Sequence, residues 1–254
     1  QLKNGIILVI CLQAFMSSCL TKIALNSMGV FDKEVSKKYI SNGNKHLVFF
    51  EMHHVGKQAF YDDVKHDLDS LLGEGYKLFF EGVGLDKSID SLTKDTLFRK
   101  VRKITGMDMN ALSKNNGYLD TANNKLAGKK TSLIKKNKLV NQPPRMYPKD
   151  DTIRTKRVDE NYLSLVIAVE KKFGPIVLEP VDYNTKFGEK YKVPKNKTMR
   201  NYFIQEYRNE LIADAIIRDT ASKIILLYGK KHLEGIFENL QKADPGYRFV
   251  DKLP

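Results

Sequence analysis

Three side chains that could perform chemistry occupy similar places in the sequence. His54 comes two residues after an apolar run, Glu81 directly follows a second run, and His232 lies four residues past a third. Two imidazoles and one carboxylate form a common catalytic metal set that leaves coordination positions for water or substrate. The sequence therefore predicts a site for a divalent metal ion, and manganese, cobalt and zinc each suit such ligands.

The apolar runs at 46–52, 76–80 and 223–228 are rich in β-forming residues and predict buried strands. Helical spacing of apolar residues over 58–72 joins the first two runs into a strand–helix–strand unit, in which the strands are parallel. In open parallel sheets ligands bind outside the carboxyl ends of the strands. We therefore expect the two histidines and the glutamate to converge at one edge of a sheet.

The remaining segments complete an α/β fold with a mixed, mainly parallel central sheet flanked by helices. Further helices are expected at 86–106, 158–173, 198–221 and 233–241, and further strands at 175–181 and 246–250. Residues 107–157 lack a clear period and carry eleven Lys or Arg between Asn124 and Arg157, which predicts a helical or irregular basic cap. We expect residues 44–254 to form one domain with this cap as an insertion.

Each candidate ligand also has a structural explanation. His54 could be an N-terminal residue of the helix that follows it, Glu81 a partner of a helix N-cap, and His232 the cap of the last helix. A helix N-terminus would keep an imidazole neutral, which is the form that binds metal. His53 is expected at the surface or behind the site, and His46 and His66 are expected to be structural.

Arg208 is a further candidate because it interrupts an apolar helical face. That face is formed by residues spaced three and four apart, namely Ile204, Arg208, Leu211, Ile212 and Ala215. A buried arginine usually needs a carboxylate or a bound anion. Alternatively, the guanidinium extends past the rim of the core into water. Asn209 is its neighbour in either case.

The N-terminal segment resembles the signal peptide of a bacterial lipoprotein. Lys3 precedes an apolar stretch from Ile6 to Met16, which is short for a membrane span, and Met16-Ser-Ser-Cys19 follows. We expect residues 1–18 to be a signal peptide and residues 19–43 a lipidated tether that holds the protein at the bacterial cell envelope by acylated Cys19. The alternatives are an uncleaved hydrophobic start and a cysteine placed there by chance.

Composition narrows the classes of site and partner. The two cysteines, Cys11 and Cys19, both lie in this segment, so the mature domain would have no disulfide, thiolate metal site or cysteine nucleophile. The formal net charge is +13, which suits a nucleic-acid or membrane-surface partner or reflects a lysine-rich solvated surface. Export to the envelope argues against nucleic acid, whereas contact with anionic lipid headgroups stays open.

Four short motifs in order give the chain a resemblance to a known family. They are Phe50-Glu-Met-His-His54-Val-Gly56, Phe79-Phe-Glu81, the helical pair Arg208-Asn209, and Tyr228-Gly-Lys-Lys-His232-Leu-Glu-Gly235. This order resembles the TraB/PrgY/GumN family, which includes the Tiki metalloproteases and is distantly similar to the erythromycin esterase and ChaN-like groups. The resemblance covers about ninety residues, which lie at the two ends of the domain.

The resemblance implies a metal-dependent, peptidase-like hydrolase acting on a peptide or small molecule. His54, Glu81 and His232 would be metal ligands or would activate water, while Arg208, with Asn209 beside it, would hold an oxyanion or a substrate carboxylate. The first motif departs from the family because Glu51 stands where the family has glycine, so Glu51 could itself join the site.

Two questions stay open from the sequence. An acidic side chain from the middle segment could close the site, and the candidates are Asp150, Asp151 and Asp159. The competing function is a lipoprotein that binds a peptide, a metal or a haem-like ligand without turnover, as PrgY-like and ChaN-like relatives suggest.

Overall fold

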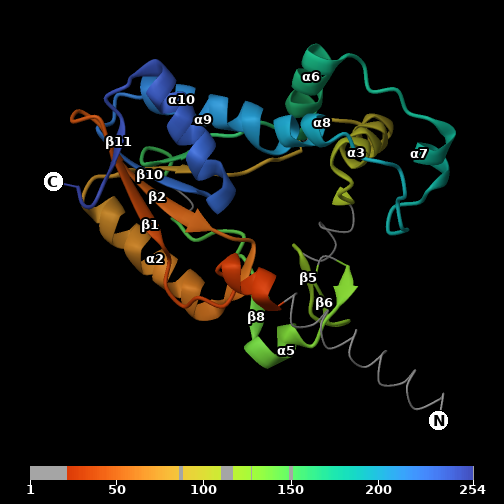
Figure 1. Ribbon diagram of the computed structural model, residues 1–254, viewed down its shortest axis with the longest axis horizontal. Coiled ribbons are helices and arrows are strands. Elements are labelled where there is room, and N and C mark those ends of the chain that lie inside the picture. The colour runs from red at the N-terminus through yellow and green to blue at the C-terminus, as the bar shows by residue number, and fades with distance from the viewer. Residues whose placement is uncertain (1–21, 86–87, 110–116, 127, 149–150, 254) are drawn as a thin grey trace, which may run out of the picture. The chain divides into compact units, whose positions relative to one another are not determined.

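The computed structural model divides the chain into two compact units (Figure 1). It describes residues 22–85, 88–109, 117–126, 128–148 and 151–253. The larger unit consists of residues 36–52, 67–114 and 147–254, and the smaller unit of residues 1–35, 53–66 and 115–146. The sequence predicted one domain with residues 107–157 as an insertion, and the larger part of that insertion falls in the smaller unit.

The larger unit is built on a six-stranded sheet, and the predicted α/β fold class is confirmed. In spatial order the strands are β11 (Arg248–Val250), β1 (Lys37–Ser41), β2 (His46–Met52), β10 (Lys223–Gly229), β4 (Lys77–Phe80) and β9 (Thr155–Arg157). The four strands from β2 to β9 are parallel, whereas β1 is antiparallel to both of its neighbours.

The centre of the sheet is formed by the three strands that the sequence predicted from their apolar runs. Leu226 in β10 lies opposite Phe49 in β2 and Phe79 in β4, and none of the three side chains is exposed. Strands buried on both faces read as continuous apolar runs, as these do. Their parallel pairing brings the carboxyl ends of β2, β10 and β4 to one edge.

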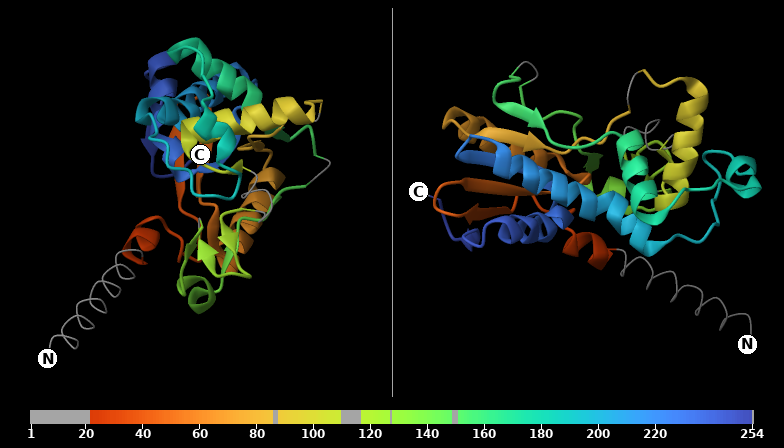
Figure 2. Two further views of the ribbon diagram at one scale, coloured as in Figure 1. Left: turned by 90° about the vertical axis from the view of Figure 1, so that its right-hand side faces the viewer. Right: turned by 90° about the horizontal axis from the view of Figure 1, so that it is seen from above.

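Helices cover the sheet and continue beyond it. On one face lie α9 (Tyr207–Arg218) and α10 (Leu233–Ala243), which pack against each other and against the sheet in a common core that includes Ile212 and Ile236 (Figures 1 and 2). A second core joins α3 (Ser91–Thr105), α6 (Tyr162–Phe173) and the helical run before α9 through Val101, Val169 and Phe203. Among the described residues no helix has the length and apolar character needed to cross a membrane.

The smaller unit has its own core. It contains a two-stranded pair of β3 (Val55–Lys57) and β8 (Leu139–Asn141), a three-stranded sheet of β5 (Leu119–Asp120), β6 (Lys125–Leu126) and β7 (Lys129–Lys130), and α5 (Leu133–Asn137). Residues 22–27 are helical as well. Apolar side chains from all parts meet in this core, including Leu25, Val30, Val55, Leu119 and Leu133. Helix α2 (Gln58–Gly73), which the sequence predicted, begins in the smaller unit and ends in the larger.

One predicted strand is wrong. Residues 174–179 form no regular element, and α7 (Pro180–Asn184) follows them. Pro180 occupies the first helical turn, where its missing N–H costs nothing, and Glu179 and Asp182 form a capping box around it. Val177, read as a buried strand residue, is 67% exposed. The helix N-terminal signals of Glu179, Pro180 and Asp182 therefore outweighed the tendency of the short apolar run to form a strand.

Two strands lie in segments where none was expected. β1 falls within residues 19–43, the expected tether, and β9 falls at the end of the expected cap. Both are short and carry lysines, so neither shows the apolar run that marks a buried strand. The cap was expected to be helical or irregular, but its described part contains β5, β6, β7 and β8 as well as α5.

The predicted helices over 58–72 and 233–241 are α2 and α10, whereas the other three begin later than expected or are interrupted. Helix α3 begins at Ser91 with Asp90 as its N-cap, and α6 begins at Tyr162 after the N-cap Asn161. The predicted helix over 198–221 is a run of α8 (Lys197–Asn201), a π-helical turn at Tyr202–Glu206 and α9. Such π turns occur often at functional sites.

Candidate functional site

The candidate site lies at the carboxyl ends of three neighbouring parallel strands of the larger unit. Glu81 directly follows β4, Asp159 is two residues past β9, and His232 is three residues past β10. Helix α9 supplies Arg208 and Asn209, both of which are buried. Because β9, β4 and β10 are adjacent and parallel, their ends meet at one edge, as the sequence predicted for Glu81 and His232.

Arg208 joins two carboxylates. Its Nε donates to Asp159 Oδ1 at 2.9 Å, and its Nη2 donates to Asp159 Oδ2 at 2.6 Å and to Glu81 Oε1 at 2.7 Å. Nη1 donates to the carbonyl of Ile204 at 3.1 Å, one turn back along the helix. Burial acts to lower the pKa of Arg208, but the bonds and charges of Asp159 and Glu81 outweigh it and raise that pKa. The guanidinium therefore stays charged inside the fold.

The Glu81 carboxylate is held from two sides. Besides the bond from Arg208 to Oε1, the backbone N–H of Gly229 donates to Oε2 at 3.1 Å. The side chain keeps 22% of its surface exposed, compared with 7% for Arg208 and none for Asp159. Glu81 is therefore the carboxylate of this cluster that solvent reaches. Among the helices of the described residues, none has Glu81 as its N-cap.

His232 is oriented by Asn209. The Nδ1 atom of His232 lies 2.7 Å from Asn209 Oδ1, and its Nε2 atom lies 3.9 Å from Glu81 Oε1. An amide oxygen facing Nδ1 requires a proton on that nitrogen, so in the neutral ring the lone pair lies on Nε2. His232 ends the 3₁₀ turn Lys230–His232 before α10, but its side chain does not cap that helix.

Of the three acidic candidates that the sequence left open, Asp159 and Asp151 lie in the described part of the chain, and Asp159 belongs to the cluster. Its Oδ2 also accepts from the backbone N–H of Gly82 at 3.0 Å. Asp151 instead binds its own turn, where it accepts from the backbone N–H of Arg154 at 2.9 Å. Asp150 lies outside the described residues. Asp159 was one of the predicted candidates, but its place after a strand could not single it out, because β9 was not predicted.

Tyr228 is a further member of the cluster that the sequence reading missed. Its hydroxyl is fully buried and donates to the carbonyl of Val158 at 2.8 Å. Burial, and then the negative charges of Asp159 and Glu81, raise the pKa of Tyr228 well above its ordinary value. Tyr228 therefore stays a neutral donor that ties the end of β10 to the residue before Asp159.

Glu51 lies on β2 opposite Tyr228 of β10 and is only 7% exposed. Its Oε2 lies 3.2 Å from Nζ of Lys230, which is two residues before His232. The departure from the family pattern at position 51 thus introduces a carboxylate that pairs with the turn leading to His232. This places Glu51 beside that turn, and a direct role in chemistry stays a prediction.

His54 lies in the smaller unit and is exposed. Its ring stacks on Tyr118, with centroids 5.1 Å apart. The prediction that it precedes a helix is wrong, because β3 intervenes between His54 and α2. Its neighbour His53 was expected at the surface or behind the site, and both of its ring nitrogens are buried and have no hydrogen-bond partner among the described residues. Burial lowers the pKa of His53.

The donors of the larger unit fit two positions of a metal site. Ligand atoms at zinc-type bond lengths of about 2.0–2.2 Å lie roughly 3.3 Å apart, so His232 Nε2 and Glu81 Oε1, which are 3.9 Å apart, would have to move closer to share an ion. Among the described residues no three His, Cys, Asp or Glu side chains are grouped as a metal site. The third predicted ligand, His54, belongs to the other unit, and Cys19 lies outside the described residues.

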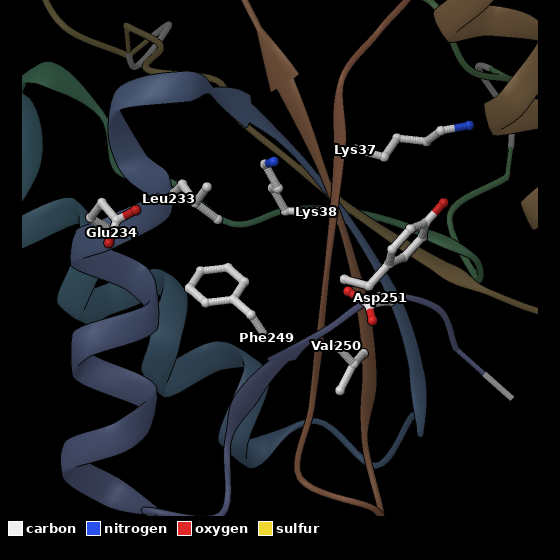
Figure 3. Close-up of a pocket in the computed structure, with 8 residues that line it drawn as sticks. Lys37, Lys38, Leu233, Glu234, Phe249, Val250 and Asp251 are labelled. Atoms are coloured by element: carbon white, nitrogen blue, oxygen red, sulfur yellow. The ribbon is translucent and has the colours of Figure 1, made fainter.

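A separate groove of about 460 Å³ occurs in the larger unit, between the start of α10 and the strands β1 and β11 (Figure 3). Phe249 lies in it between Leu233 and β1, and charged side chains of both signs surround it. Among its described lining residues none is a member of the Glu81 cluster. We find no match between this chain and any family model, curated protein or solved structure.

Proposed function

We propose that the protein is a metal-dependent hydrolase of the cell envelope, peptidase-like and related to the TraB/PrgY/GumN family, held at the membrane by lipidated Cys19. One observation carries the proposal. The Nε2 atom of His232 faces Glu81 Oε1 at 3.9 Å, while Asn209 occupies the other ring nitrogen. A second partner on the far nitrogen of a histidine is the usual arrangement behind a metal-ligating imidazole.

The charges of the cluster favour a cation. Glu81 and Asp159 bring two negative charges, Arg208 brings one positive charge, and the three are joined by hydrogen bonds. A neutral His232 leaves this group with an excess negative charge at its solvent-accessible member, Glu81. Hard or borderline divalent cations bind carboxylate oxygen and imidazole nitrogen together.

In this proposal each residue of the chain has a separate task. A divalent metal ion would supply a Lewis acid that lowers the pKa of water and polarises a carbonyl. Glu81 and His232 hold that ion, and the role of His54 as a ligand stays a prediction from the sequence. Arg208 and the Gly229 N–H fix the direction of the Glu81 carboxylate, and Asn209 fixes the His232 ring. Arg208 acts here through Glu81.

Metal content is the direct test. The purified full chain is analysed for metals after dialysis, alongside His232→Ala, Glu81→Gln and His54→Ala. We expect close to one divalent ion per chain in the wild type. In His232→Ala and Glu81→Gln the metal should bind roughly a hundredfold more weakly, which is the upper end of the loss in metal affinity found when groups around a metal site are changed. His66→Ala, which changes an exposed histidine of α2, should retain the metal. A wild type without specific metal contradicts the proposal.

A second candidate is binding without turnover, and the bonding of Arg208 favours it. All three nitrogen atoms of Arg208 donate to protein acceptors. The guanidinium is thus committed to the fold, whereas a hydrolase of this type could use it on the substrate. Product formation from a mixed peptide library separates the candidates. Metal-dependent cleavage lost in Glu81→Gln supports the hydrolase, and metal-retaining protein that cleaves nothing supports the binding protein.

A further inference from the structure

The chain between the proposed lipid anchor and the smaller unit is short. Only two residues separate Cys19 from Lys22, where the description of the chain begins. Three peptide steps span at most about 11 Å. Leu25 and Val30 then belong to the core of the smaller unit, and the N–H of Val35 donates to Asp63 at 2.8 Å. Residues 22–35 are therefore folded into that unit and do not act as a flexible tether.

The smaller unit carries a concentration of positive charge. Between positions 117 and 148 the sequence has seven basic residues and one acidic residue, Asp120. Helix α5 buries Leu133 and Ile134 in the core and exposes Lys135 and Lys136 on its other side. Among the described residues no carboxylate lies within ion-pair distance of these two lysines.

The three-stranded sheet adds two lysines that face each other. Lys125 of β6 is the direct cross-strand partner of Lys130 of β7. Leu126, the next residue of β6, packs against the core, so the lysine pair points to the opposite face. Asp120, opposite Lys125 on the other side, accepts hydrogen bonds of 2.9 to 3.2 Å from Asn123, and these bonds together with the charge of Lys125 lower the pKa of Asp120, so its negative charge offsets part of the charge of Lys125. Like charges directly opposite in a sheet are destabilising unless an anion offsets them.

We propose that Lys125 and Lys130 of the three-stranded sheet and Lys135 and Lys136 of α5, here together called the lysine face because each pair points away from the core of the smaller unit, bind the anionic headgroups of the membrane that holds Cys19. This inference rests on the lipid anchor of the proposed function but not on the metal site. An anchor with a reach of about 11 Å keeps Lys22, where the smaller unit begins, within one or two Debye lengths of the bilayer, and lysines of the unit that come as near are attracted to anionic lipid. The lysine face thus adds an electrostatic contact to the lipid chains.

Vesicle sedimentation tests the lysine face without the lipid anchor. The full chain with Cys19→Ser is mixed with vesicles of phosphatidylcholine alone or with 30% phosphatidylglycerol, a composition on the order of natural anionic membranes. We expect binding to the anionic vesicles that falls steeply with salt. Changing the four lysines to Gln should weaken this binding at least tenfold, since each lysine contributes at most about fivefold to the affinity.

The control changes the same number of charges elsewhere. Lys171, Lys190, Lys192 and Lys197 are exposed lysines of the larger unit, and their change to Gln should leave binding within about twofold. Equal losses in both variants would show a simple effect of net charge and overturn the proposal. Equal binding to neutral vesicles, or tighter lysine-dependent binding of an oligonucleotide, would also overturn it. None of these results depends on metal content or hydrolysis, so the two proposals fail separately.

Discussion

Asn209 Oδ1 lies 2.7 Å from Nδ1 of His232, so helix α9 sets the orientation of a ring that lies 23 residues further along the chain. The same helix carries Arg208, which directs the carboxylate of Glu81. One turn of α9 therefore determines how both proposed ligands of the larger unit point, and this relationship leads to the first predictions.

Asn209→Ala should lower metal affinity more than it lowers stability. Without the amide oxygen the ring of His232 loses its preferred proton position, and loss of such a partner costs about 10–100-fold in metal affinity. Titration with zinc or manganese, monitored by calorimetry, measures the change. Asn239→Ala on α10 removes an amide that donates only to the Gly235 carbonyl at 2.8 Å, and its metal affinity should match the wild type.

Gly235→Ala should reproduce the effect of the Asn209 variant from the other side. A methyl group at position 235 would lie 2.0 Å from Asn209 Nδ2, so the amide must move. We expect weaker metal binding together with a loss of stability of about 1–3 kcal/mol, the range for forced packing changes in a core. Urea unfolding and metal titration test the two effects. Unchanged values for both would show that Asn209 has another position.

Arg208→Met should destabilise the larger unit strongly. It leaves Asp159 buried and Glu81 partly buried without their common cation, which typically costs about 3–5 kcal/mol. The matched control is Arg218→Met on the same helix, where an exposed pair with Asp214 at 3.1 Å should contribute less than about 0.5 kcal/mol. Urea unfolding of the two variants should give clearly different midpoints. Similar midpoints would mean that the Arg208 cluster contributes little.

Gly229→Ala should fold normally and still impair the site. The residue has φ −54° and ψ 136°, which any L-residue adopts, and a methyl group there would lie 3.6 Å from Glu81 Oε2 and 3.8 Å from His232 Cδ2. These are ordinary contacts, so the free energy of unfolding should change by less than about 1 kcal/mol. The methyl group occupies space beside both groups, and we expect metal affinity to fall about tenfold. Unfolding and metal titration together test this separation of effects.

Asp182 should give the protein a stability that acid removes. The carboxylate is fully buried, and burial by itself raises its pKa. It accepts hydrogen bonds from the Glu179 N–H at 2.8 Å, from the Tyr191 hydroxyl and from Lys103 at 2.9 Å. These bonds outweigh the effect of burial and lower the pKa below 3.8. A depressed pKa stabilises the fold above the unfolded value and loses that effect as pH falls through the folded value. Asp182→Asn should therefore cost about 1–3 kcal/mol at pH 7 and progressively less as pH falls below the unfolded pKa of about 3.9, measured by urea unfolding at each pH.

The strands that position the site could be predicted because burial leaves a local signature. β2, β4 and β10 are apolar along their length, since they are covered on both faces, and the positions of Glu81 and His232 follow from where those runs end. The expectation that Arg208 needs a carboxylate also came from local sequence, because a charge in an apolar helical face must be paired.

The partners themselves could not be predicted, because they depend on which strands become neighbours. Asp159 meets Arg208 only because β9, a short polar strand with no local signature, joins β4 at the edge of the sheet. The pairing of His232 with Asn209 depends on how α9 and α10 pack against each other. The spacing of apolar residues within each helix does not predict that packing. The sequence determined which residue types occur at the ends of the strands, and the tertiary structure alone decided which atoms face each other, because side-chain bonds form across distances that local patterns do not encode.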